Sequence, residues 1–102
     1  MSLCNLADLA DGEPHRFDAD GRRICVVRIG DTVYALDDRC SHQDYSLSEG
    51  LVNADEQSIE CPKHGSSFGL ATGEALSLPA TKPVQAYRVE IKGGRVGIAD
   101  WA

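Results

Sequence analysis

Two short motifs, each with one cysteine and one histidine, constrain this chain more than any other feature of its sequence. The first is Cys40-Ser41-His42 and the second is Cys61-Pro62-Lys63-His64. Residues 43–60 separate them, too few for an independent domain, so this spacer must loop out and return. The sequence therefore predicts that two thiolates and two imidazoles converge on one point, where they can hold a metal centre.

The order of the ligands within each motif separates two kinds of metal centre. A zinc ion and a binuclear iron–sulfur cluster both accept this ligand set. Zinc fingers usually pair like with like, two cysteines and then two histidines, whereas each motif here is mixed. A [2Fe–2S] cluster explains the mixture if each motif sends its cysteine to one iron and its histidine to the other. We therefore predict a cluster held by Cys40, His42, Cys61 and His64, with a zinc-stabilised interaction module as the alternative.

Around these motifs the sequence resembles the Rieske family. Gly65-Ser66 follows the second histidine, and residues 46–50 and 72–80 are similar to segments that flank the cluster in Rieske ferredoxins. The resemblance covers nearly all of the 102 residues, and it points to the ferredoxin components of bacterial ring-hydroxylating dioxygenases. It implies that the Ser66 hydroxyl donates to a bridging sulfide. It also implies that Phe68 stands where high-potential relatives place a tyrosine that donates to a cluster sulfur.

The composition is that of a small acidic domain. At 102 residues the chain is long enough for one domain. A formal net charge of −6 argues against a nucleic-acid partner, because phosphates select basic surfaces. The charge fits a protein that meets a basic patch on a partner, and it equally fits solubility alone. Neither a signal peptide nor an apolar run of about 18 residues is recognisable, so we predict a soluble, cytoplasmic protein without membrane contact.

The pattern of strand and turn signals predicts an all-β domain. The run 22–29 is nearly all apolar, so both faces of this strand are expected to be buried. Many short strands with frequent turns indicate an antiparallel β-sandwich or barrel. Strands are predicted over 14–18, 22–29, 32–36, 51–52, 58–60, 66–70, 84–91 and 95–99, with a further strand and a turn of helix within 1–9.

The resemblance implies a Rieske fold, in which a small cluster-binding subdomain is inserted into a β base. On this basis we predict a single domain over 1–102, with a base of 1–38 and 72–102 and a cluster-binding subdomain of 39–71. Cys4 and Cys25 lie in apolar strand-like segments. We expect both to be buried free thiols, because a disulfide is improbable in the cytosol.

The sequence shows no catalytic constellation, and the resemblance implies an electron carrier that is not itself an enzyme. Such a protein takes one electron from a flavin-dependent reductase and passes it to a terminal ring-hydroxylating oxygenase of aromatic hydrocarbon catabolism. We expect a monomer. The alternatives are the small Rieske subunit of an assimilatory nitrite reductase and the ferredoxin of another cytosolic redox system. The aromatic substrate leaves no signature in this chain, because the ferredoxin does not touch it.

Overall fold

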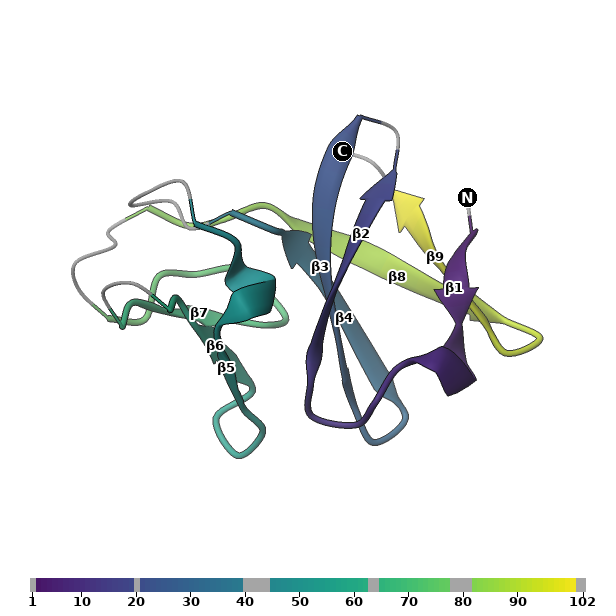
Figure 1. The fold of residues 1–102 in the computed structure, drawn as a ribbon, viewed down its shortest axis with the longest axis horizontal. Coiled ribbons are helices and arrows are strands. Elements are labelled where there is room, and N and C mark those ends of the chain that lie inside the picture. Colours follow the sequence, from purple (N-terminus) through teal and green to yellow (C-terminus); the bar gives the residue numbers. More distant parts are fainter. Residues whose placement is uncertain (1, 20, 40–44, 63–64, 78–81, 101–102) are drawn as a thin grey trace.

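The computed structural model describes residues 2–19, 21–39, 45–62, 65–77 and 82–100 (Figure 1). Its strands are β1 (Ser2–Asn5), β2 (Pro14–Ala19), β3 (Arg22–Ile29), β4 (Thr32–Asp37), β5 (Leu51–Asn53), β6 (Ser58–Glu60), β7 (Ser67–Gly69), β8 (Ala86–Lys92) and β9 (Arg95–Asp100). Two short 3-10 helices are also present, η1 (Leu6–Asp8) and η2 (Leu47–Glu49). Within these ranges no helix has the length and apolar character needed to cross a bilayer.

The strands form two antiparallel sheets, which confirms the all-β prediction. The large sheet has the order β1-β9-β8-β4-β3-β2, and the small sheet has the order β5-β6-β7. Each predicted strand is present, and most of its bounds lie within one or two residues of the prediction. The helix η2 was not predicted, because the polar residues around it resemble those of an ordinary turn.

β3 contributes to two separate cores. Ile24 and Val26 point into a core on one face of the large sheet, and Cys25 and Val27 point into a core on the other face. All four side chains are almost completely buried. Successive side chains of a strand alternate between its faces, so a strand that is covered on both sides must be apolar at every position. This confirms the expectation for the run 22–29.

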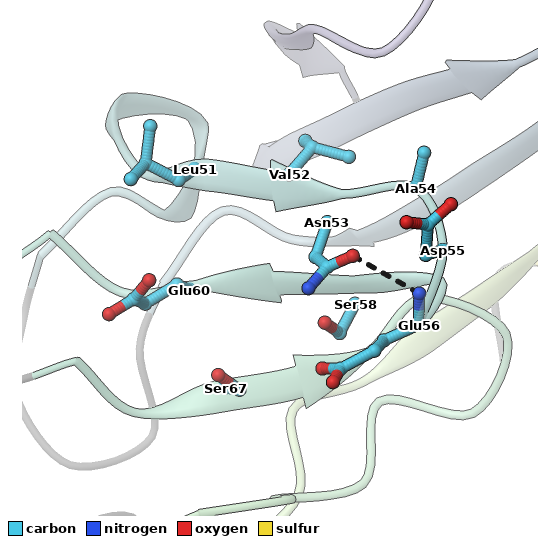
Figure 2. A pocket seen from close by; sticks show the side chains of 9 residues that line it. All are labelled: Leu51, Val52, Asn53, Ala54, Asp55, Glu56, Ser58, Glu60 and Ser67. Atoms are coloured by element: carbon cyan, nitrogen blue, oxygen red, sulfur yellow. Dashed lines mark hydrogen bonds between the residues drawn. The ribbon is translucent and has the colours of Figure 1, made fainter.

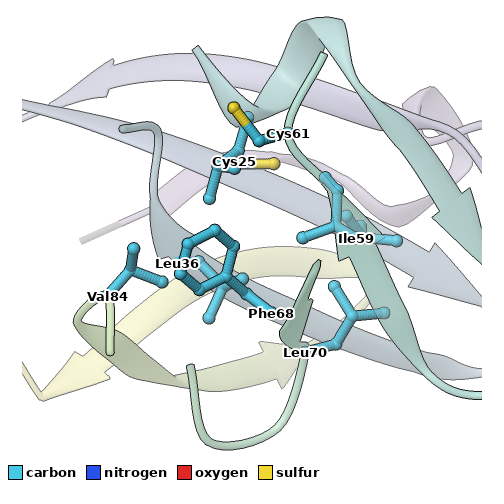
Figure 3. Packing of buried hydrophobic residues seen from close by; sticks show 9 residues of the cluster. Cys25, Leu36, Ile59, Cys61, Phe68, Leu70 and Val84 are labelled. Carbon is cyan, nitrogen blue, oxygen red and sulfur yellow. The ribbon is translucent and has the colours of Figure 1, made fainter. Parts of the chain in front are cut away.

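The second of these cores joins the two sheets. Figure 3 shows Phe68 of β7 beside Leu36 and Val84, with Cys25 and Cys61 next to each other at one end of the cluster. Phe68 is fully buried. Burying a side chain of this size contributes about 1.5–3 kcal/mol relative to leaving it exposed. The small sheet is therefore packed firmly against β3 and β4.

The small sheet belongs to an excursion of the chain between β4 and β8. The chain leaves the large sheet after Asp37, and the Asp37 backbone N–H donates to the Gln85 carbonyl at 2.8 Å. Next to this bond, Leu36 pairs with Ala86 in the sheet. The Tyr87 hydroxyl of β8 donates to Asp37 Oδ1 at 2.5 Å, a second hydrogen bond between the end of β4 and β8. The two ends of the excursion are therefore neighbours.

Candidate metal centre

Cys61 and Ser66 lie within the described residues, whereas Cys40, His42 and His64 lie outside them. Cys61 is 2% exposed and Ser66 is fully buried. The ligand roles of these residues therefore stay predictions. The described residues show which hydrogen bonds attach the two loops that contain the predicted ligands.

The second motif lies in a loop that its own backbone closes. Cys61 follows β6, and its N–H donates to the Ser66 carbonyl at 2.7 Å. The Gly65 N–H donates back to the Cys61 carbonyl at 3.3 Å. Gly65 has a φ of +72°, a left-handed conformation that glycine adopts without the steric cost that a side chain brings. Two backbone hydrogen bonds thus connect the described ends of this loop, Cys61 at one end and Gly65-Ser66 at the other.

Leu76 and Ser77, which follow β7 in the chain, form hydrogen bonds with this loop and with Ser67. The Ser77 hydroxyl accepts a hydrogen bond from the Ser67 N–H at 2.9 Å and lies 3.4 Å from the Gly65 carbonyl, to which it donates. The Leu76 N–H donates to the Ser67 carbonyl at 2.7 Å. The position of the second motif is therefore determined by residues on both sides of β7.

The first motif lies in the longer segment 39–47, and one side chain joins the two residues that flank it, Asp38 and Ser48. Asp38 follows β4, and its carboxylate accepts two hydrogen bonds from Ser48 in η2. The Ser48 N–H donates to Oδ1 at 2.6 Å, and the Ser48 hydroxyl donates to Oδ2 at 2.9 Å. The Asp38 N–H donates to the Arg23 carbonyl of β3 at 2.9 Å. These contacts attach the loop to the large sheet.

The two loops meet where the first ends and the second begins. Gly50 follows η2, and Glu60 immediately precedes Cys61. Leu51 pairs with Glu60 across β5 and β6. Leu47 of η2 is fully buried in the same core as Cys61. The described backbone thus brings the end of the first loop beside the start of the second, as the spacer requires. The predicted set of two thiolates and two imidazoles suits a [2Fe–2S] cluster chemically.

The other two described cysteines, Cys4 and Cys25, lie outside the two motifs. Burial, and then the negative charge of Asp38, raise the pKa of the Cys25 thiol far above its ordinary value. Cys25 is a buried neighbour of Cys61 in the same core. Cys4 is half-buried, and burial also raises its pKa. Both thiols are free, as expected, although Cys4 is more accessible than we predicted.

A shallow hollow on the outer face of the small sheet has a different character (Figure 2). The described residues that line it include three carboxylates, and none of them is a cysteine or histidine. Leu51 at one end of this hollow is 72% exposed. The lining residues are Leu51, Val52, Asn53, Ala54, Asp55, Glu56, Ser58, Glu60 and Ser67. The carboxylates of this acidic hollow are hard oxygen donors, unlike the thiolate and imidazole groups of the two motifs, and within the described ranges they are not grouped so that they could hold a metal ion.

Three structural residues of the site were missed by the sequence analysis, namely Asp38, Ser48 and Ser77. Each acts through a hydrogen bond to a residue about ten positions away. The only local signal was an aspartate directly after an apolar strand and two residues before Cys40. Nothing in the sequence indicates that its carboxylate is buried.

Comparisons with known proteins agree on one family. A model of the Rieske [2Fe–2S] domain matches residues 1–88. The 3-phenylpropionate/cinnamic acid dioxygenase ferredoxin subunit of Escherichia coli K12 is 44% identical over 95 residues, which are 93% of this chain and 88% of that protein.

Solved structures are similar along almost the whole chain. The ferredoxin of carbazole 1,9a-dioxygenase from Nocardioides aromaticivorans IC177 has a TM-score of 0.95 at 39% identity, covering 97% of this chain and 95% of its own. A chain in a complex of reduced oxygenase and oxidized ferredoxin in carbazole 1,9a-dioxygenase has a TM-score of 0.89 at 39% identity, covering 97% of this chain and 100% of its own.

Proposed function

We propose that this chain, which belongs to the Rieske [2Fe–2S] family, carries single electrons to the terminal oxygenase of a ring-hydroxylating dioxygenase system. It holds one [2Fe–2S] cluster and supplies electrons without catalysing the oxygenation. The observation that carries the proposal is the contact between Gly50 and Glu60, which joins the end of the first loop to the start of the second. The residues of these loops match the chemistry of the cluster.

The ligand assignment is part of the proposal. Cys40 and Cys61 hold one iron through their thiolates, and His42 and His64 hold the other through neutral imidazoles. When bound, the cluster stores one electron at a potential above that of an all-cysteine ferredoxin. Ser66 is fully buried at the end of the second loop, and we propose that its hydroxyl donates to a cluster sulfide.

The division of the chain follows from the same assignment. We propose that residues 39–71 form the cluster-binding part and that 1–38 and 72–102 form the base. The topology supports this division, because the small sheet lies wholly within the excursion between β4 and β8.

The proposed partners are a flavin-dependent reductase, which donates the electron, and the terminal oxygenase, which receives it. The complex of oxygenase and ferredoxin in carbazole 1,9a-dioxygenase supports the second partner. The net charge of −6 supports protein partners with basic patches over nucleic acid. We further propose that the protein acts in the cytoplasm as a monomer.

The test starts from protein purified from cells supplied with iron. Equal amounts of bound iron and acid-labile sulfide, with a Rieske EPR signal after reduction, are expected. The protein should then accept electrons from a flavin-dependent reductase and support turnover by a ring-hydroxylating oxygenase. Bound zinc without sulfide would contradict the cluster, and electron transfer to a nitrite reductase alone would contradict the proposed partner.

A further inference from the structure

Among the described residues, Asp38 is the one charged side chain that is completely buried. Removing a carboxylate from water is costly unless hydrogen bonds replace those made to water. Such a residue needs compensating partners nearby, and its position is therefore strongly determined. Asp38 lies directly between β4 and the loop that carries the first motif.

The partners of Asp38 come from several parts of the chain. Both carboxylate oxygens accept hydrogen bonds from Ser48, at 2.6 and 2.9 Å. The half-exposed guanidinium of Arg16 in β2 lies 3.9 Å from Oδ2. The Asp38 N–H is bound to the Arg23 carbonyl of β3. One residue thus connects β2, β3, the end of β4 and η2.

The two loops of the site are closed in different ways. The second loop is short, and the backbone bonds between Cys61, Gly65 and Ser66 close it. In the longer loop 39–47, residues 38 and 48 are joined by the Asp38 carboxylate and Ser48. Among the described residues, the Asp38 side chain therefore makes the hydrogen bonds that join the two ends of this segment.

We propose that Asp38 and Ser48 form a buried clasp that positions Cys40 and His42 on the cluster. This inference rests on the proposed ligand assignment. Cys40 is two residues from Asp38 along the chain, so we expect a change at Asp38 to disturb cluster ligation by Cys40 and His42. Asp38 and Ser48 are positioning residues, because they act on the cluster through the ligands that they hold in place.

The experiment compares Asp38→Asn and Ser48→Ala with Asp37→Asn in the cluster-loaded protein. Asparagine has one carbonyl oxygen and an NH2 group that cannot accept, so Asp38→Asn removes at least one bond from Ser48. Ser48→Ala removes only the bond from the hydroxyl. Asp37→Asn is the control, because it makes the same substitution one residue earlier, at a carboxylate that accepts a hydrogen bond from the Tyr87 hydroxyl.

We expect Asp38→Asn to shift the EPR g values and to release iron to a chelator about tenfold faster, which corresponds to about 1.4 kcal/mol. Ser48→Ala should produce a smaller change in the same direction, and Ser48→Thr, which keeps a hydroxyl, should restore most of it. Asp37→Asn should lower the melting temperature yet keep the wild-type g values and iron-release rate.

Several results would overturn the clasp. One is an Asp38→Asn protein with wild-type g values and release rate, and another is an Asp37→Asn protein with the same changes as Asp38→Asn. If Asp38→Asn does not fold, Ser48→Ala decides, and wild-type behaviour of that variant overturns the positioning role. A wild-type protein without a Rieske signal would instead overturn the ligand assignment, and with it the positioning role.

Discussion

Gly50 packs so closely against the carbonyl group of Glu60 that a Cβ at residue 50 would stand 1.8 Å from the carbonyl oxygen. No side chain fits in that space without moving the backbone. Because Glu60 precedes Cys61, this contact joins the end of the first loop to the start of the second. The site therefore depends on a glycine that is not itself a ligand.

Gly50→Ala should lower the stability of the protein and reduce its iron content. Overpacking of this kind costs about 1–3 kcal/mol, and each kcal/mol lowers the melting temperature of a domain of this size by about 4–8 °C. Melting curves and iron analysis check the prediction. Gly69→Ala is the control, because its Cβ would meet only the rotatable hydroxyl of Thr72, at 3.2 Å. Equal effects of the two variants would contradict the role of the contact.

Replacing His42 or His64 with alanine should abolish the Rieske EPR signal, because one iron loses one of its two protein ligands. The matched control is His15→Ala. His15 lies in β2, and its Nε2 accepts a hydrogen bond from the Ala10 N–H. That variant should keep the signal. A normal Rieske signal from either of the first two variants would refute the ligand assignment.

Phe68→Tyr should raise the reduction potential by tens of millivolts, and Ser66→Ala should lower it. Hydrogen bonds to the cluster sulfurs favour the reduced state, because that state carries one more negative charge. A difference of about 1.4 kcal/mol between redox states corresponds to about 59 mV for one electron. The wild-type potential should accordingly lie toward the lower end of the Rieske range. Voltammetry measures both shifts.

Because Phe68 is buried, the experiment needs a control for disturbed packing. Its ring lies beside Leu36 and Val84 (Figure 3), so an added hydroxyl also perturbs the packing. Phe68→Leu disturbs the packing without adding a donor, and it should leave the potential nearly unchanged. A Phe68→Tyr protein with full cluster content and the wild-type potential would show that the hydroxyl does not reach a sulfur.

Raising the pH should lower the free energy of unfolding through Cys25. Burial, followed by the negative charge of Asp38, raises the pKa of this thiol in the folded protein. The unfolded chain loses the proton at the ordinary thiol pKa of about 8.5, while the folded protein retains it. The stabilisation is therefore complete below that pH and declines above it, by up to about 1.4 kcal/mol per pH unit. Urea unfolding between about pH 7 and 9.5 measures the decline.

The control for the alkaline effect is Cys25→Val, which keeps an apolar side chain and removes the titrating group. Its stability should fall less steeply over the same pH range. Identical slopes for Cys25→Val and the wild type would show that the thiol does not contribute. Because Cys25 lies in the same core as Cys61, both proteins are compared at equal cluster content.

Electron transfer to the partners should slow as ionic strength rises, because salt screens charges over about 8 Å at physiological concentration. Glu60 lines the acidic hollow. Its carboxylate also lies beside the loop of the second motif, because a Cβ built on Gly65 would be 3.1 Å from Glu60 Oε1. Glu60→Gln should therefore weaken the salt dependence. Asp31→Asn removes the same charge from the β3–β4 turn and is the control. Transfer rates that do not respond to salt would leave the net charge as a solubility feature only.

The sequence predicted those parts of the fold that local patterns determine. Alternation and turn residues located the strands, and the continuous apolar run of β3 indicated that both of its faces are buried. The two mixed motifs predicted the [2Fe–2S] family that the family model matches, whereas the assignment of the four ligands stays a prediction. These signals are readable because each depends on residues within a few positions of one another.

The supporting structure of the site was not predictable in the same way. The bonds from Ser48 to Asp38 and from Ser67 to Ser77 join residues about ten positions apart, and serines and aspartates are equally common in exposed turns. Only the three-dimensional packing shows that the Asp38 carboxylate is buried. The close contact of Gly50 with Glu60 likewise depends on how η2 approaches β6.

The hydrogen bond between the Asp37 N–H and the Gln85 carbonyl holds the two ends of the intervening chain together, which is the first requirement for transplanting this segment. Its two ends already meet on adjacent strands, so the register of the large sheet is independent of the length of the segment between them. A host sheet with a similar pair of strands offers the same attachment point. Excision, however, uncovers Cys25, Val27 and Leu36. A recipient scaffold must therefore present an apolar face of matching shape as well as a place to insert the chain.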